Sequence, residues 1–174
     1  LTMEQLFAVK HSYLIPLLPL LAAAIAGFLC TGSRKKLAHW PIWIGVGISA
    51  ILSVTLLFGM ASVWHDHHGP LAYVQNWYQW ITAGPAGVSG TFDVAVGFLF
   101  DPLTAVMLCV VTVIGFFITV FAAGYMKGEE GYFRFFAYLG MFIFMMTMLV
   151  MGDNFLMLYL GWEGVGLCSY LLIG

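Results

Sequence analysis

Five almost wholly apolar stretches divide the chain, and short polar segments separate them. A helix needs about 20 mainly apolar residues to cross the hydrocarbon layer of a membrane. The pattern therefore predicts an all-α, polytopic membrane protein, and we expect residues 1–174 to form a single transmembrane domain. The predicted helices cover residues 13–30, 41–64, 102–126, 135–151 and 155–174.

Two of these helices have clear signals at their first residues. Asp101 stands directly before Pro102, an order typical of an N-cap followed by the first helical position. Gly152, Asp153 and Asn154 make a tight connection between the fourth and fifth helices. We therefore predict a helical hairpin there, with Asp153 or Asn154 as the cap of the last helix.

The connection between the second and third helices, residues 65–101, is long and has a pattern of its own. Residues 76–81 are rich in aromatic side chains, which suits a membrane–water interface, and residues 84–90 have the glycine and proline of turns. Residues 91–99 partly alternate between apolar and small or polar side chains. We predict a short strand or β-hairpin on the outer surface, where it shields the helix ends or docks a partner.

Charged residues are scarce and unevenly placed. The chain is 62% hydrophobic and 8% charged, whereas a soluble domain carries about 25% charged residues. Its formal net charge of -2 gives no reason to expect nucleic acid or another polyanion as a partner. Basic residues cluster in the first and third connections, and residues 65–101 contain none. Because basic loops stay in the cytoplasm, we expect the N-terminus and the long connection outside.

Glu163 lies in the middle of the last apolar stretch. A carboxylate near the centre of a membrane helix costs about 2.5–3.5 kcal/mol, so we expect it to serve proton transfer, ion coordination or a fixed ion pair. Helical spacing places Tyr159, Gly166 and Tyr170 on the same face, where the two phenols could hold water or steady the carboxylate. The candidate site is Glu163 as the proton-transferring group, with support from Tyr159, Tyr170, Gly164 and Gly166.

Small residues surround this carboxylate. Gly161, Gly164 and Gly166 would let another helix or a file of water come close, or would serve packing alone. A cation that moves nearby could switch the ionisation of Glu163. All six basic residues lie in loops or near the termini, so we expect that cation in another chain or beyond Gly174.

Other residues with metal-binding chemistry give weaker signals. His65, Asp66, His67 and His68 could bind a divalent metal, but adjacent loop residues rarely complete a site, and a solvated helix end is the preferred interpretation. The three cysteines lack metal-site spacing, and they and the methionines are expected to pack as apolar side chains. We predict no metal and no cofactor in this chain.

Two polar stripes run along the second and third predicted helices. Hydroxyls in membrane helices commonly bond to their own backbone or to a neighbouring helix, so we favour packing seams over a water path. The stripes are Gly45, Ser49 and Ser53, and Thr104, Thr112, Gly115 and Thr119.

Residues 124–174 resemble a known family, most specifically in the segment WEGVGLCSYLLIG at residues 162–174. The segment FDPLTA at residues 100–105 is also similar. The family is subunit L of bacterial NADH:quinone oxidoreductase, whose mitochondrial counterpart is subunit 5 of respiratory complex I. The resemblance implies an antiporter-like, proton-translocating subunit of about 14 membrane helices, arranged in inverted repeats. Five of these helices are expected in this sequence. Glu163 matches the glutamate on the family's fifth helix, which pairs with a lysine on the seventh.

The resemblance also implies cofactors and partners. NADH, FMN, iron–sulfur clusters and quinone would be bound by partner subunits, while this chain would carry only protons. Other membrane-arm subunits, especially the adjacent antiporter-like subunit, would surround it in the bacterial cytoplasmic membrane. The alternatives are a subunit of a multisubunit Na+/H+ antiporter or of a bicarbonate-uptake complex with the same fold, and a purely structural anchor.

Overall fold

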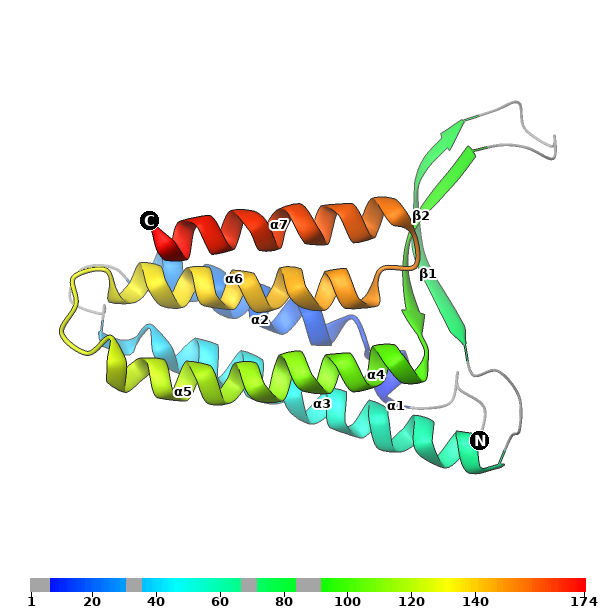
Figure 1. The fold of residues 1–174 in the computed structure, drawn as a ribbon, viewed down its shortest axis with the longest axis horizontal. Helices are drawn as coiled ribbons and strands as arrows, with labels where there is room; N and C mark the ends of the chain where they lie inside the picture. Colours follow the sequence, from blue (N-terminus) through cyan, green and yellow to red (C-terminus); the bar gives the residue numbers. More distant parts are fainter. Residues whose placement is uncertain (1–6, 31–35, 67–71, 84–91) are drawn as a thin grey trace.

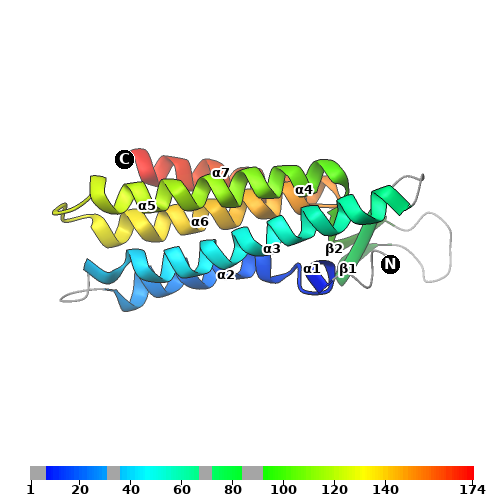
Figure 2. The same cartoon turned by 90° about the horizontal axis from the view of Figure 1, so that it is seen from below.

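A computed structural model describes residues 7–30, 36–66, 72–83 and 92–174 (Figure 1). The helices run side by side along the long axis, and a β-hairpin crosses one end of the bundle, the hairpin end (Figures 1 and 2). We name the opposite end, where α5 joins α6, the loop end. The elements are α1 (Phe7–Lys10), α2 (Leu14–Ala24), η2 (Ile25–Leu29), α3 (His39–Asp66), β1 (Tyr73–Ala83), β2 (Phe92–Phe100), α4 (Pro102–Cys109), η4 (Val110–Ile114), α5 (Gly115–Tyr125), α6 (Tyr132–Met151) and α7 (Phe155–Ile173).

Four helices among the described residues are long and apolar enough to cross a membrane. A shorter apolar helix, Leu14–Phe28, stands at the place predicted for the first span. The predicted polytopic, helical membrane protein with a hairpin between the second and third helices is confirmed, whereas the 14-helix arrangement implied by the resemblance stays a prediction. The chain is an integral membrane protein. Its four candidate spans are His39–Val63, Pro102–Tyr125, Tyr132–Met151 and Phe155–Ile173.

The start of the third span follows its sequence signal. The side chain of Asp101 accepts a hydrogen bond from the Thr104 N–H at 2.6 Å, and Pro102 occupies the first turn. Proline has no N–H to leave unsatisfied at this position, and its fixed φ suits a helix. The predicted cap is confirmed.

Two helices contain a wider, π-type turn that the apolar pattern did not predict. η4 joins α4 to α5, so the third span continues through it, and η2 prolongs α2. The Cys30 N–H donates to the Ile25 carbonyl at 3.3 Å, and the buried Thr112 hydroxyl donates to the Leu108 carbonyl at 2.7 Å. A π-type turn changes the backbone pairing without a required change in composition. Hydrophobic patterning therefore cannot locate it.

α6 lies between α2 and α7, and α3 packs against α2, α4 and α5 (Figure 1). Two clusters of buried apolar side chains hold the bundle together. One, near the loop end, includes Ile42 and Phe136. The other, at the hairpin end, includes Leu56, Phe100 and Leu108. The hairpin thus contributes to the same core as the ends of the helices.

The two polar stripes lie at helix contacts. Ser49 is buried, and its hydroxyl donates to the Ile15 carbonyl of α2 at 2.9 Å. Ser53 bonds to the Ser49 carbonyl one turn earlier at 2.9 Å. Thr119, also buried, donates to the Phe116 carbonyl at 2.7 Å. Ser49 thus joins α3 to α2, as predicted for a packing seam, whereas the Ser53 and Thr119 hydroxyls bond within their own helices.

β1 and β2 form an antiparallel hairpin that begins with Tyr73 opposite Phe100. The strands have 11 and 9 residues, so the hairpin is longer than the short element predicted. Its register shifts twice within residues 76–81, and such bulges bend and twist a strand. The distal part of the hairpin extends past α7 (Figure 1). The turn predicted at residues 84–90 lies outside the described residues.

Candidate functional site

Asn154 begins α7 and ties this helix to the hairpin. Its Oδ1 accepts from the Met157 N–H at 3.0 Å, which confirms a cap at this turn. Its Nδ2 donates to the Ala95 carbonyl of β2 at 2.7 Å and to Oδ1 of Asp153 at 2.6 Å. One side chain therefore satisfies a free N–H at the helix start and holds that start against β2.

Gly97 allows β2 to approach the α6–α7 turn. A Cβ at Gly97 would lie 2.6 Å from Oδ2 of Asp153, and it would also clash with Oδ1 of Asn76. The neighbouring residue, Phe98, pairs with Gly152 as an isolated β-bridge. Sequence reasoning missed this junction, although a glycine inside a strand often marks a close backbone approach. The hairpin thus positions the helix that carries Glu163.

We expect substitutions of Asn154 to destabilise the subunit in two steps. Asn154→Ser keeps a capping oxygen but loses the bond to Ala95, which costs about 1 kcal/mol. Asn154→Ala also loses the cap, for about 1 kcal/mol more. Thermal unfolding of the full-length subunit in detergent should rank wild type above the serine variant and the serine variant above the alanine variant. An alanine variant as stable as wild type would contradict the claim that Asn154 stabilises the contact between α7 and the hairpin.

One face of α7 packs on α6 through glycines. A Cβ at Gly161 would lie 2.7 Å from the Cα and from the N of Leu149. A Cβ at Gly164 would lie 2.7 Å from Cγ of Met145. Both glycines are buried, and this face also contains the buried Met157. Gly161 and Gly164 therefore permit the close contact of the two helices.

The face of α7 that carries Glu163 is exposed in the described structure. Tyr159 is 57% exposed and Tyr170 is 73% exposed, and a Cβ at Gly166 would meet no described atom within 4 Å. Glu163 is exposed midway along the helix, and its carboxylate interacts with the Tyr159 hydroxyl. The structure thus places Tyr159, Glu163, Gly166 and Tyr170 on one open face and Gly164 on the α6 side.

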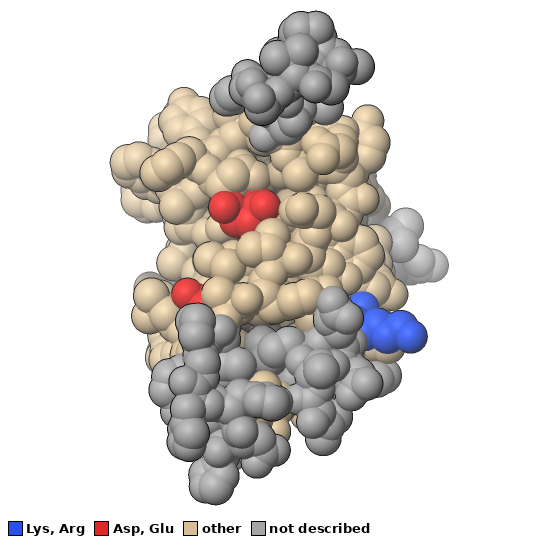
Figure 3. Space-filling model, turned by 90° about the vertical axis from the view of Figure 1, so that its right-hand side faces the viewer, with Lys and Arg blue, Asp and Glu red and all other residues tan. Residues whose placement is uncertain are grey.

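The basic side chains of the described residues lie away from the middle of α7. Lys10 is in α1 at the hairpin end, and Arg134 is in the first turn of α6. Lys36 and Lys127 line a common cleft beside Tyr132 at the loop end. The described part of the surface at the hairpin end shows acidic atoms near its middle and a basic side chain at one edge (Figure 3). The helical part of the chain therefore offers no lysine or arginine at the depth of Glu163 among the residues described.

The other residues with metal-binding chemistry are dispersed. Cys30 and Cys168 are buried, and Cys109 is half-buried, all as free thiols. Within the described ranges, no group of three or more His, Cys, Asp or Glu side chains is gathered as for a metal ion. His65 and Asp66 end α3, whereas His67 and His68 lie outside the described residues.

Comparisons with known proteins agree with the sequence pattern. The family model for the N-terminus of chain 5 of NADH-ubiquinone oxidoreductase (complex I) matches residues 87–136. NADH-quinone oxidoreductase subunit L of Neisseria meningitidis is 41% identical over 163 residues, which cover 92% of this chain and 22% of that protein. The same subunit of Pseudomonas aeruginosa is 47% identical over 132 residues, or 74% of this chain and 20% of that protein.

The chain belongs to the complex I subunit L and chain 5 family. It spans about a fifth of the length of these subunit L relatives, at the part that the family model names the N-terminus. The solved Mrp complex from Dietzia contains a chain with the same fold, with a TM-score of 0.63 and 22% identity over 92% of this chain and 15% of that one. The fold of this chain is therefore shared with part of a chain of the Mrp complex.

Proposed function

We propose that this chain is the N-terminal part of a proton-translocating membrane-arm subunit of NADH:quinone oxidoreductase. Family membership supports the complex. The observation that carries the proton role is Glu163, a carboxylate midway along the α7 span on a face that no described residue covers. Such residues in membrane helices usually face protein or water and transfer protons or ions.

The exposed face of α7 is expected to meet the rest of the subunit. Exposure of Glu163 to lipid would cost about 2.5–3.5 kcal/mol, whereas burial against protein allows the carboxylate to be paired. A unit positive charge at about 4 Å stabilises an ionised carboxylate by about 4 kcal/mol in a protein of moderate polarity. The arrival and departure of that charge would make Glu163 release and bind a proton. In this proposal the Tyr159 hydroxyl, one turn earlier on the same face, steadies the carboxylate.

The remaining parts of the machinery belong to other subunits in this proposal. NADH, FMN, iron–sulfur clusters and quinone are bound there, and the adjacent antiporter-like subunit is the closest partner. The N-terminus and the hairpin face the outside of the bacterial cytoplasmic membrane. This orientation is supported by Lys36, Lys127 and Arg134, which all lie toward the loop end.

The main alternatives are a subunit of an Na+/H+ antiporter, a subunit of a bicarbonate-uptake complex, and a structural anchor. Purification of the natural full-length subunit through an affinity tag, in mild detergent, separates the two other complexes from the respiratory one, and the pumping of Glu163 variants tests the structural anchor. We expect flavin, iron–sulfur clusters and NADH:quinone activity in the purified assembly. An assembly of membrane subunits alone, without flavin or iron, would contradict the respiratory role.

A further inference from the structure

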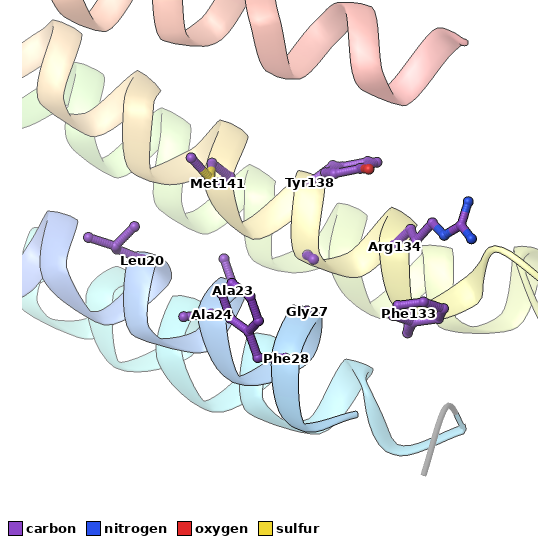
Figure 4. Close-up of a pocket in the computed structure, with 10 residues that line it drawn as sticks. Leu20, Ala23, Ala24, Gly27, Phe28, Phe133, Arg134, Tyr138 and Met141 are labelled. Atoms are coloured by element: carbon purple, nitrogen blue, oxygen red, sulfur yellow. The ribbon is translucent and has the colours of Figure 1, made fainter. Parts of the chain in front are cut away.

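A cleft of about 490 Å³ opens between α2–η2 and α6 (Figure 4). Its α2–η2 wall is made mainly of small residues, including Ala23, Ala24 and Gly27. A Cβ at Gly27 would lie 3.4 Å from that of Ala137 on α6, so the two helices approach closely there. Phe28 is 82% exposed at the rim. The cleft is therefore an apolar channel on the outside of the bundle.

Two polar side chains stand at one end of this apolar cleft. Arg134 and Tyr138 are one turn apart on α6, and both extend toward the loop end (Figure 4). The Arg134 guanidinium carbon lies 5.7 Å from the centre of the Phe133 ring, which also lines the cleft. An apolar channel thus ends at a cation and a phenol, close to the first turn of a membrane span.

We propose that this cleft binds an anionic phospholipid. One acyl chain lies along the apolar wall, and the phosphate accepts hydrogen bonds from Arg134 and Tyr138. A guanidinium matches phosphate with two parallel N–H donors, and basic pockets between membrane helices bind anionic head groups. The cleft therefore matches such a lipid in two ways. Its apolar lining suits the acyl chain, and the Arg134 cation suits the phosphate of the head group.

The polar end of the cleft argues against a further membrane helix as its occupant. The cleft ends at the Arg134 guanidinium and the Tyr138 phenol, and a charged head group satisfies these two side chains better than the apolar face of a membrane helix does. A thin acyl chain can follow the length of the cleft. This inference uses no part of the proposed proton transfer and stands independently of it.

Photochemical labelling tests the site. The full-length subunit in its native assembly is placed in phosphatidylcholine nanodiscs with a trace of photoactivatable phosphatidylglycerol or, separately, photoactivatable phosphatidylcholine. We expect the anionic probe to label peptides of α2 and α6 at the cleft more strongly than the neutral probe. Arg134→Gln should lower that labelling about tenfold, as expected for loss of a charge-assisted hydrogen bond.

Three further variants sharpen the test. Arg134→Lys keeps the charge but loses the paired donors, and an intermediate labelling is expected. Ala24→Phe fills the cleft and leaves Arg134 in place, so labelling should fall although the charge remains. Lys10→Gln removes a cation at the hairpin end and should change nothing. Equal labelling by both probes, no labelling at the cleft, or full labelling of an assembled Arg134→Gln variant would each overturn the proposal.

Discussion

Glu163→Gln is expected to abolish most proton pumping by the assembled complex. Glutamine has nearly the shape of glutamate and can still bond to Tyr159, but it cannot release a proton. A positioned acid or base contributes typically 10²–10⁴-fold to proton transfer, so we expect a loss of at least about 100-fold through this path. The measurement is NADH-driven acidification in proteoliposomes, with the rate of NADH oxidation recorded in parallel.

Matched variants separate the role of Glu163 from a general loss of charge. Glu163→Asp keeps an ionisable group on a shorter side chain and should retain part of the pumping. Glu130→Gln removes the exposed loop carboxylate of Glu130 and should pump like wild type. Each variant is first checked for full assembly. Normal pumping by an assembled Glu163→Gln variant would contradict the proton role and favour a structural anchor.

Gly161→Ala should separate α7 from α6 and lower the stability of the subunit. The added Cβ would lie 2.7 Å from the Cα and the N of Leu149, and backbone atoms cannot rotate away as a side chain can. Overpacking of this kind typically costs 1–3 kcal/mol, so the helices must shift or the subunit must unfold more readily. Thermal unfolding in detergent and the amount of assembled subunit in membranes measure this effect.

Gly124→Ala is the control for that variant. The substitution is identical and also lies in a helix, the last turn of α5, but the new Cβ meets no described atom within 4 Å. Alanine also favours helix over glycine by about 1 kcal/mol, so the stability of this part should not fall. Equal destabilisation by both variants would contradict the packing account. A stable Gly166→Ala variant with reduced pumping would support the predicted role of Gly166 beside Glu163.

The helices were predictable because their signals are local. Long apolar runs mark the spans, and caps such as Asp101 and Asn154 mark first residues within one turn. The alternating pattern around Phe98 likewise identified the second strand of the hairpin. Each of these signals depends on neighbours in the sequence. In a membrane protein, the length of an apolar run also indicates whether a helix can cross the hydrocarbon layer.

The parts that escaped prediction depend on contacts between distant residues. The role of Gly97 appears only when Asp153, far along the chain, comes within contact of it. Gly161 and Gly164 could have served packing or water access, and only the position of α6 places them in the helix contact. The cleft beside Arg134 likewise requires the relative positions of α2 and α6.

Infrared difference spectroscopy tests the ionisation of Glu163 most directly. Spectra of the assembled complex are compared between the resting state and steady turnover with NADH and quinone, for wild type and for Glu163→Gln. We predict a carboxyl band that changes with turnover in wild type, shifts in heavy water and is missing in the glutamine variant. Identical difference spectra from the two proteins would mean that Glu163 keeps one protonation state throughout, and would contradict the account.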